Sequence, residues 1–380
     1  MKSVTVVGAS LAGLSSARAL REQGFDGTIT LVGDEIHRPY DRPPLSKSFL
    51  KGIDDGLSLE TSDDEALDLQ WRLGVRATGL SAGEVLLADG SCVRSDAVVI
   101  ATGASAIRLF DDTAGVHVLR SLDDALALRQ ELVPGARVAV IGAGFIGSEV
   151  ASTAVELGCS VTVLEASPAP LERVFGAHIG SLVAAWHGRG GATLMTGAPV
   201  SGLTSLGSRV TAVEFADGTT VPADVVVVGI GSRPNIEWLA GSGIALAGGV
   251  VTDRRGLSSI PGVVAVGDCA AVRDPSTGIT VRDEHWTAAA TRPTVAMKSL
   301  LSGGESVEVF TGVPYVWSDQ YQSRIQFAGH QGPECLSDIV EGDPTVGPFV
   351  AVYRRAGQPV AVLAVSSPRA FGKWRRQLVT

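Results

Sequence analysis

The chain has 380 residues, of which 45% are hydrophobic and 19% charged, and this length predicts two or three domains. Its 46 glycines and its mean hydropathy of +0.25 are typical of a compact enzyme rich in turns, which excludes an intrinsically disordered chain. The net charge of −9 and the isoelectric point of about 5.2 argue against a general nucleic-acid-binding protein.

The first predicted elements are a strand, a glycine-rich turn and a helix. Lys2–Val7 is rich in β-branched residues, and a helical pattern follows the turn Gly8-Ala-Ser-Leu-Ala-Gly13. A second predicted strand, Thr28–Val32, ends close to Asp34 and Glu35. This order predicts a parallel βαβ unit with an acid beyond the end of its second strand.

A proline-rich segment, Arg38-Pro-Tyr-Asp-Arg-Pro-Pro-Leu-Ser-Lys47, follows this unit. Its prolines restrict the backbone and predict a stiff, extended loop that brackets Arg42 and Lys47. Two cations on a rigid loop are suited to a pyrophosphate and a flavin. A solvated surface loop has the same composition, so both interpretations stay open on composition alone.

The same elements return later in the chain. Arg137–Ile141 is a second such strand and is followed by the turn Gly142-Ala-Gly-Phe-Ile-Gly147 and a helical pattern. Ser160–Leu164 then ends on Glu165, as the first copy ends close to its acids. Each copy then has a hairpin signal, and from the hairpins onward the copies keep one fixed offset in sequence. The first copy has Ala88-Asp-Gly90, Asp96, Ala97–Ala101 and Thr102-Gly103, and the second has Ala216-Asp-Gly218, Asp224, Val225–Val228 and Ile230-Gly231. The match predicts two units of one architecture.

Each glycine of such a turn has a physical role. The first permits the tight turn, the second lets the backbone approach a pyrophosphate, and the third lets helix and strand pack closely. The helix N-terminus offers free N–H groups to the phosphates, and the acid accepts hydrogen bonds from ribose hydroxyls. Ser10 replaces the middle glycine of the first copy, and we expect this small side chain to be tolerated and to donate its hydroxyl to a phosphate. Two dinucleotide sites are therefore predicted.

The acid of the second copy indicates which dinucleotide binds there. Glu165 is followed by Ala166 and Ser167, so no Lys or Arg stands directly beside it to receive a 2′-phosphate. A carboxylate at this position bonds the 2′-hydroxyl and repels a 2′-phosphate, which favours NADH over NADPH. Arg173 is close enough in sequence to weaken this inference, and a solvated loop acid is the alternative for Glu165. The first copy is then expected to hold FAD.

The last third of the chain adds two features. Asp268 follows the apolar strand Val263–Val266, and acids at strand ends lie where α/β proteins bind ligands, although a helix N-cap is the simpler alternative. From about Thr311 several short strands alternate with turns, before the basic segment Lys373-Trp-Arg-Arg376. With Arg354 and Arg355 this segment could face an acidic partner, and a solvated helix face is an equal alternative. The predicted strands are Ile325–Ala328, Phe349–Tyr353 and Val360–Val365.

Cysteine spacing and hydropathy limit the class of protein further. The cysteines lie far apart and form neither a Cys-x-x-Cys pair nor a metal-ligand cluster, so we expect structural thiols and no metal. No apolar run reaches the roughly 18 residues of a membrane span, and no signal peptide precedes the first strand, so we expect a cytoplasmic protein without membrane contact. The four cysteines are Cys92, Cys159, Cys269 and Cys335.

Five segments occur together in an order that is more specific than these general patterns. They are Pro39-Tyr-Asp-Arg-Pro-Pro-Leu-Ser-Lys47, Gly142-x-Gly-Phe-Ile-Gly-x-Glu149, Ala265-Val-Gly-Asp268, Glu284-His-Trp286 and Trp317-Ser-Asp-Gln320. With them the whole chain resembles the NADH-dependent ferredoxin reductases that serve oxygenases and cytochromes P450, such as the putidaredoxin, rhodocoxin and biphenyl-dioxygenase reductases. Rubredoxin reductases and apoptosis-inducing factor are more distant relatives of that family.

The resemblance implies a fold and a division into domains. The fold is α/β, with two Rossmann-like dinucleotide-binding domains arranged as in glutathione reductase and a C-terminal α+β domain. Residues 1–108 and 246–308 would form a discontinuous FAD-binding domain, residues 109–245 an NADH-binding domain, and residues 309–380 a C-terminal interface domain.

The resemblance also implies residue roles for FAD. Gly8, Ser10 and Gly13 would hold the pyrophosphate, and Asp34 or Glu35 would bond the adenosine ribose. Asp268 would bond the ribityl chain. The other expected FAD residues are Leu11, Ala12, Arg42, Lys47, Ala77, Ala101, Thr102, Gly103, Arg120, Gly267, Ala289 and, along the isoalloxazine, His285, Trp286 and Trp317.

For the nicotinamide side, the implied residues centre on the second turn. NADH would be held by Gly142, Gly144, Phe145, Ile146, Gly147, Glu165, Arg173 and Gly231. Glu284 would lie near the nicotinamide. Lys47 and Glu149 are the pair that we expect beside flavin N5, because a buried ammonium needs a carboxylate partner. Their expected task is to orient the nicotinamide and to stabilise charge as the flavin is reduced.

The position of the cysteines bears on the electron acceptor. Disulfide reductases need a cysteine pair near the flavin, and NADH oxidases and peroxidases need one thiol near residues 45–50, where this chain has Leu-Ser-Lys-Ser-Phe-Leu. Electrons are therefore expected to pass directly to an outside acceptor or to oxygen. The family implies a small ferredoxin of the 2Fe–2S or 3Fe–4S type, no nucleic acid, and a monomer or weak dimer. The alternatives are a rubredoxin reductase, a binding protein that responds to NADH like apoptosis-inducing factor, or another flavin enzyme of the monodehydroascorbate or nitrite reductase type.

Overall fold

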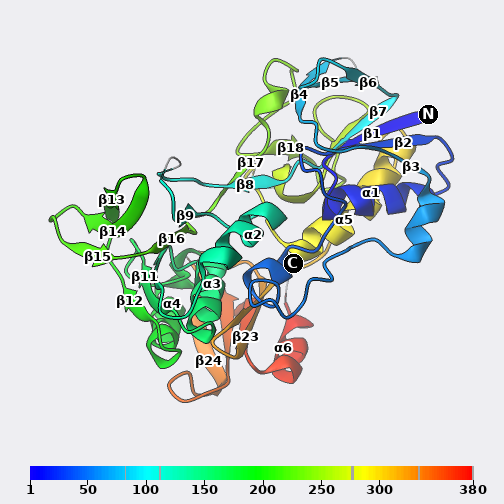
Figure 1. Cartoon of the computed structure of the whole chain (residues 1–380). Coiled ribbons are helices and arrows are strands. Elements are labelled where there is room, and N and C mark those ends of the chain that lie inside the picture. Colours follow the sequence, from blue (N-terminus) through cyan, green and yellow to red (C-terminus); the bar gives the residue numbers. More distant parts are fainter. Residues whose placement is uncertain (82, 111–112, 275–277, 333, 379–380) are drawn as a thin grey trace. The chain divides into compact units, whose positions relative to one another are not determined.

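The structure is a computed structural model that describes residues 1–380 except 82, 111–112, 275–277, 333 and 379–380 (Figure 1). The chain forms two compact units, each made of segments that are distant in sequence. The first unit comprises Met1–Asp41, Leu57–Ser105 and Arg233–Pro314, and the second comprises Arg42–Gly56, Ala106–Ser232 and Tyr315–Thr380.

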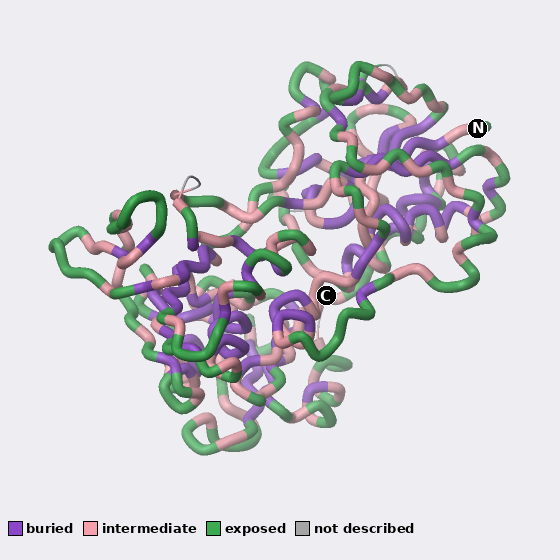
Figure 2. Tube along the Cα trace, in the orientation of Figure 1, coloured by how far each residue is buried: buried purple, intermediate pink, exposed green. Residues whose placement is uncertain are grey.

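The first unit is built on a five-stranded parallel sheet of order β19-β7-β1-β2-β3. Its strands are β1 (Ser3–Val7), β2 (Thr28–Val32), β3 (Leu69–Arg72), β7 (Ala97–Ile100) and β19 (Val263–Ala265). The central strand β1 pairs Val7 with Val32 on one side and with Ile100 on the other. Runs of valine and isoleucine suit a strand that is buried on both faces, which places this sheet in the core (Figure 2).

Two helices pack together against this sheet, α1 (Leu11–Glu22) and α5 (Trp286–Leu301). Ala17 and Leu20 of α1 are buried in the same hydrophobic cluster as Met297 and Leu300 of α5. A small antiparallel sheet, a small mixed sheet and short 3-10 helices complete the unit. They are β4 (Ala77–Ser81), β5 (Glu84–Leu87) and β6 (Cys92–Arg94), then β18 (Val250–Thr252), β20 (Ala270–Arg273) and β21 (Thr280–Val281), and η2 (Ser62–Leu67), η3 (Glu237–Leu239) and η4 (Gly267–Cys269).

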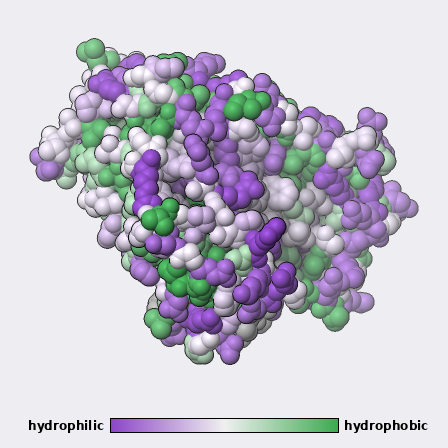
Figure 3. All heavy atoms as spheres, turned by 90° about the horizontal axis from the view of Figure 1, so that it is seen from below, coloured by the Kyte–Doolittle hydropathy of each residue, from purple (hydrophilic) through white to green (hydrophobic). Residues whose placement is uncertain are grey.

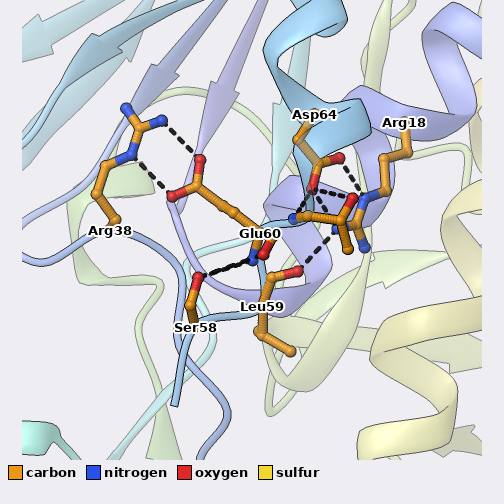
Figure 4. A network of polar contacts seen from close by, with 7 residues as sticks. Arg18, Arg38, Ser58, Leu59, Glu60 and Asp64 are labelled. Carbon is orange, nitrogen blue, oxygen red and sulfur yellow. Dashed lines mark hydrogen bonds and ion pairs between the residues drawn. The ribbon is translucent and has the colours of Figure 1, made fainter. Parts of the chain in front are cut away.

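A polar network fixes η2 and the segment before it to α1 (Figure 4). Arg18 on α1 donates to both carboxylate oxygens of Asp64, with 2.6 Å between Nη2 and Oδ2, and also to the carbonyl of Leu59. The hydrogen bond from Arg18 lowers the pKa of Asp64 to about 2. Arg38 forms a second bidentate pair with Glu60, and its guanidinium lies 3.7 Å from the ring centroid of Trp71. Arg38 is therefore held by protein groups on two sides.

The second unit contains a parallel sheet of the same kind, of order β12-β11-β10-β16-β9. Its strands are β9 (Val116–His117), β10 (Arg137–Ile141), β11 (Ser160–Leu164), β12 (Thr193–Met195) and β16 (Val225–Val228). The central strand β10 pairs Ile141 with Leu164 and with Val228, as β1 does in the first unit. The surrounding elements are α2 (Leu122–Glu131), α3 (Phe145–Glu156), α4 (Glu172–Arg189), the 3-10 helix η1 (Pro43–Ser46) and the antiparallel sheet β13 (Val200–Leu206), β14 (Arg209–Phe215) and β15 (Thr220–Pro222).

The same unit carries a C-terminal antiparallel sheet of order β22-β23-β26-β25-β24, with α6 (Pro368–Arg375) at its end. Its strands are β22 (Tyr315–Gln320), β23 (Ser323–Gly329), β24 (Leu336–Gly342), β25 (Phe349–Arg355) and β26 (Gln358–Val365). Phe349 and Tyr353 of β25 and Leu363 of β26 are buried with Phe175 of α4 in one cluster. The chain passes between the units along β8 (Ala104–Ala106) and β17 (Ser232–Pro234), which pair with each other.

The internal duplication extends to single hydrogen bonds. Asp96 precedes β7 and accepts the N–H groups of Lys2 and Ser3 at the start of β1. Asp224 precedes β16 and accepts the N–H group of Arg137 at the start of β10, and the guanidinium of the same residue lowers the pKa of Asp224 to about 2. Each acid therefore joins the start of β7 or β16 to the first strand of its own sheet. The predicted α/β fold with two Rossmann-like units and a C-terminal domain is confirmed.

One local prediction was wrong. The segment around Arg42 was expected to be an extended loop, but Pro43–Ser46 forms the 3-10 helix η1, with prolines in its first two positions. Proline fixes φ near the helical value and has no N–H group to leave unpaired in a first turn, so it starts a short helix as readily as it stiffens a loop.

Within the described ranges, every helix falls short of the length and apolar character that crossing a membrane requires. Hydrophilic and hydrophobic residues are interspersed over the face of the molecule drawn in Figure 3.

Candidate functional site

The glycine-rich turn of the first unit leaves no room for side chains at two of its positions. A Cβ on Gly8 would lie 2.0 Å from the carbonyl oxygen of Ala101, and Gly8 has a φ of +119°. A Cβ on Gly13 would lie 1.9 Å from the carbonyl oxygen of Gly8. Ser10 is the N-cap of α1 and has an extended backbone with φ −115°, which any residue can adopt. The turn therefore requires glycine at its first and third positions and accommodates serine at the second.

The strand order gathers most of the predicted FAD residues at one edge of the first sheet. Gly8 directly follows β1, Ala101 directly follows β7, and Gly267 lies just beyond β19. The carboxyl ends of these three parallel strands lie at that same edge. Leu11 and Ala12 begin α1 at the same edge, and the first N–H groups of a helix have no partner within it. The other predicted residues that follow these strand ends are Thr102, Gly103 and Asp268.

The two acids beyond β2 differ in their surroundings. Glu35 is half-buried and accepts a hydrogen bond from the Tyr40 hydroxyl at 2.5 Å. Asp34 is exposed and lies 3.3 Å from the guanidinium of Arg76. Ala77 is buried in β4 within the hydrophobic cluster that also holds Val32, so its visible role is packing.

The start of α5 brings three predicted flavin residues next to the same turn. His285 is the N-cap, Trp286 is the first residue of the helix, and Ala289 follows one turn later. A Cβ on Gly267 would lie 2.9 Å from Ala12 and 4.0 Å from Ala289, so α1, η4 and α5 meet at this point. Trp286 Nε1 also donates a hydrogen bond to Asp41 at 2.7 Å, and Glu284 forms an ion pair with Arg282.

The second turn repeats the geometry of the first. A Cβ on Gly142, where φ is +100°, would lie 2.5 Å from the carbonyl oxygen of Gly229, and one on Gly147 would lie 2.1 Å from that of Gly142. Gly144 is the N-cap of α3 with φ −75°, and a Cβ there would meet only Gly229 at 3.9 Å. In both turns, therefore, the middle position is the one at which a side chain fits without clashing with the surrounding protein.

Glu165 is fixed by the backbone on both sides. One carboxylate oxygen accepts the N–H group of Ala143 inside the turn at 2.8 Å, and the other accepts that of Ser167 at 2.7 Å. The carboxylate therefore stands directly beside the helix that would receive the phosphates. Arg173, which weakened the inference of NADH, lies exposed in the first turn of α4. No ion pair between Arg173 and Glu165 is present among the described residues.

The remaining predicted residues of the second unit lie on several elements. Ile146 is exposed at the start of α3, and Phe145 packs edge-on against Phe175 of α4. Gly231 is exposed after β16 with φ +117°. Trp317 lies half-buried in β22 and stacks on Tyr315, with ring centroids 5.9 Å apart.

The segment around η1 brings the predicted cations into the second unit. Arg42 donates to the carbonyl oxygen of Arg120 at 2.5 Å, so two of the predicted residues are in direct contact. Lys47 Nζ lies 2.6 Å from Oε2 of Glu149 on α3 and 3.0 Å from the carbonyl oxygen of Pro43. Glu149 is only 3% exposed, which confirms that the expected ammonium–carboxylate pair forms in a buried position.

Sequence reasoning missed three buried residues around this pair. Ser46 donates to Glu149 Oε2 at 2.5 Å, and Ser318 of β22 donates to Oε1 at 2.6 Å. Gln320 donates in turn to the Ser318 hydroxyl at 2.9 Å. The available signal was the spacing of Ser318 and Gln320, because residues two apart in a strand face the same side.

The geometry of both turns fits dinucleotides. In each unit a helix begins at the carboxyl edge of a parallel sheet, behind glycines whose missing side chains open the approach, and this is where pyrophosphates bind in such folds. All four cysteines lie among the described residues and are free, and Cys269 is buried. Among those same residues, no group of three or more His, Cys, Asp and Glu side chains could hold a metal ion.

Comparison with known proteins agrees with this geometry. A family model described as pyridine nucleotide-disulphide oxidoreductase matches residues 2–292, and one described as reductase C-terminal matches residues 315–380. The ferredoxin–NAD(+) reductase component of the biphenyl dioxygenase system of Paraburkholderia xenovorans is 36% identical over 97% of this chain and 91% of its own length.

Solved structures are similar over the same extent. The crystal structure of Fdr9 has a TM-score of 0.89 and 40% identity, and the match covers 99% of this chain and 94% of that one. The putidaredoxin reductase in a covalent complex with putidaredoxin has a TM-score of 0.92 and 32% identity, over 99% of this chain and 92% of that one.

Proposed function

Because the chain belongs to the pyridine nucleotide-disulphide oxidoreductases and carries their reductase C-terminal domain, we propose that it is an FAD-dependent oxidoreductase that passes electrons from NADH to a ferredoxin. The observation that carries this proposal is the pair of glycine-rich turns, one at the carboxyl edge of each parallel sheet. Relatives named as ferredoxin reductase components of dioxygenase systems, and a putidaredoxin reductase, support a ferredoxin that serves an oxygenase or a cytochrome P450.

The proposed division of labour assigns FAD mainly to the first unit and NADH to the second. Its bounds differ from those of the units mainly because Arg42–Gly56 packs in the second unit and residues 233–245 pack in the first. Residues 1–108 and 246–308 form the FAD-binding domain, residues 109–245 the NADH-binding domain, and residues 309–380 the interface domain. The first turn with Gly8, Ser10 and Gly13 holds the FAD pyrophosphate, and Asp268 bonds the ribityl chain. The second turn with Glu165 holds NADH, because this carboxylate accepts hydroxyl groups and repels a 2′-phosphate.

When bound, FAD would supply the exchange between the electron pair of NADH and single-electron transfer to the acceptor. The protein's own contribution is to position and to stabilise. Lys47 and Glu149 form one buried ion pair, and we assign to it the orientation of the nicotinamide and the stabilisation of the charge that develops on flavin reduction. Glu284 is proposed to contact the nicotinamide, and His285, Trp286 and Trp317 to line the flavin ring.

The proposed acceptor is an iron–sulfur ferredoxin of the 2Fe–2S or 3Fe–4S type. The absence of a thiol in residues 45–50 supports direct transfer, since no cysteine there could relay electrons. The basic residues of α6 and β25 are the proposed docking groups: Arg354, Arg355, Lys373, Arg375 and Arg376. We further propose a cytoplasmic monomer or weak dimer that binds neither nucleic acid nor membrane.

A cytochrome c reduction assay tests the function. The purified protein is expected to contain FAD, to oxidise NADH slowly by itself, and to reduce cytochrome c rapidly once putidaredoxin or a 3Fe–4S ferredoxin is added. Equal rates with and without every ferredoxin, combined with an NADH-dependent change in size on gel filtration, would contradict the reductase and favour a binding protein that responds to NADH. Fast transfer only to rubredoxin would favour the rubredoxin reductase alternative.

A further inference from the structure

The buried carboxylate of Glu149 receives donors from two separate parts of the second unit. Oε2 is contacted by Lys47 at 2.6 Å and by Ser46 at 2.5 Å, both from the segment that contains η1. Oε1 is contacted by Ser318 at 2.6 Å, from strand β22. The two oxygens are therefore distinguished, because the ammonium lies on one of them and a serine hydroxyl on the other.

Ser318 is held in the orientation that this contact needs. Its side chain is fully buried, and its oxygen accepts a hydrogen bond from Gln320 Nε2 at 2.9 Å. A serine hydroxyl has one proton to donate, and an amide that donates to its oxygen directs this proton to the other partner. Gln320 is 3% exposed and thus also shielded from water, so the chain from Gln320 through Ser318 to Glu149 has a fixed direction.

A second contact sets the position of β22 along α3. The N–H group of Tyr321 donates to Ser152 Oγ at 2.8 Å, one residue past the end of β22. Ser152 follows Glu149 by three residues on α3, so the two contacts lie on the same face of that helix, and a shift of the strand would break both.

We propose that Ser318, supported by Gln320, is a positioning residue that holds Glu149 so that Lys47 points toward the nicotinamide and the flavin. Without Ser318 the carboxylate keeps donors on Oε2 alone and can rotate about its terminal torsion, which is broad and easily moved for glutamate. The C-terminal sheet then has a part in hydride transfer itself. This inference rests on the proposed function of the Lys47–Glu149 pair.

The test is the rate of flavin reduction by NADH in anaerobic stopped-flow absorbance. Ser318→Ala is expected to slow this step about tenfold, the effect of losing one hydrogen bond to a charged group. Reduction by dithionite and FAD content are expected to stay unchanged, because neither needs the nicotinamide to be oriented. Ser148→Ala is the matched control, since Ser148 is a fully buried serine on the same helix whose hydroxyl has no partner among the described residues.

A double-mutant cycle separates positioning from a general structural effect. If Ser318 acts through Glu149, then Ser318→Ala adds little to Glu149→Gln, whereas a structural role makes the two effects multiply. Gln320→Met is a second variant, and we expect it to slow the same step by a smaller factor. Wild-type rates in Ser318→Ala and Gln320→Met, or multiplying effects in the cycle, overturn the inference. Failure of the wild-type flavin to be reduced by NADH would instead overturn the proposed function.

Discussion

At the scale of single residues, Glu165 is the group on which we propose that the choice of nucleotide depends. Glu165→Gln keeps the shape of the side chain and removes its charge, while one oxygen can still accept a backbone N–H group. The variant is expected to lose about tenfold in kcat/KM with NADH, as for one charged hydrogen bond, and to use NADPH relatively better because a 2′-phosphate is no longer repelled. Asp217→Asn, in an exposed hairpin turn, is the control. An unchanged ratio of kcat/KM for the two nucleotides in Glu165→Gln would refute this role.

Single residues also mark where sequence reasoning stops. The glycine pattern was sufficient to predict the turns, and it explains Ser10, because the middle position carries no positive φ. The glycine pattern could not predict the contact of Ser318 with Glu149, because these two residues lie 169 positions apart in the chain. Such a pair is set by how a strand packs on a helix, and no local spacing encodes that. The roles of these residues toward the cofactors stay predictions.

At the scale of elements, a buried histidine links α4 to the turn after β22. His187 is 2% exposed, and its Nδ1 lies 2.7 Å from the Tyr321 hydroxyl. Burial penalises the imidazolium and lowers the pKa of His187 from 6.5 to about 4. Between these pH values His187 is protonated in the unfolded chain and neutral in the folded chain. The free energy of unfolding therefore decreases as the pH falls through this window, by up to about 1.4 kcal/mol per pH unit.

Urea unfolding at a series of pH values measures this contribution. His187→Gln is expected to remove most of the slope between pH 6.5 and 4. Losses from carboxylates such as Asp64 and Asp224, whose pKa values are lowered to about 2, are expected to remain below that window. The same slope in wild type and His187→Gln would show that another group titrates there.

Elements were predictable where hydrophobic periodicity and turns coincide. The strands β2, β10, β11 and β16 have the predicted bounds, because each is an apolar run that stops at a glycine or an acid. Two strands of the C-terminal sheet, β22 and β24, were not predicted. Tyr315–Gln320 and Leu336–Gly342 contain several polar residues. The first strand has only intermediate and buried positions, and the second has only intermediate and exposed ones. Their strand form depends on pairing with β23 and β25.

At the scale of the whole molecule, the net charge of −9 makes a basic surface unusual. Arg375 lies 4.9 Å from the ring of Tyr315, which in turn stacks on Trp317, so the proposed docking helix is linked through Tyr315 to a proposed flavin residue. Arg375→Gln with Arg376→Gln is expected to raise KM for ferredoxin several-fold and to flatten its dependence on salt, since exposed charges act mainly on encounter.

Arg94→Gln provides the matched control, because it removes an exposed arginine from β6 in the first unit. Steady-state assays at several salt concentrations compare the variants. If Arg94→Gln changes KM as much as the α6 variant does, the effect reflects net charge and no specific docking surface.

The order of synthesis gives the segment Arg42–Gly56 a further meaning. It is synthesised early, yet it belongs to the second unit. There Lys47 pairs with Glu149, and the Thr153 hydroxyl donates to the Ser46 carbonyl, so both contacts need residues that are synthesised later. Ser318, which donates to Glu149, is translated near the end of the chain. The nascent protein can therefore complete both nucleotide turns and contain both residues of the Lys47–Glu149 pair before Ser318 is made. Any product that terminates before β22 lacks the hydrogen bond from Ser318 to Glu149, and on the proposed role of Ser318 we expect such a product to transfer hydride more slowly than the full chain.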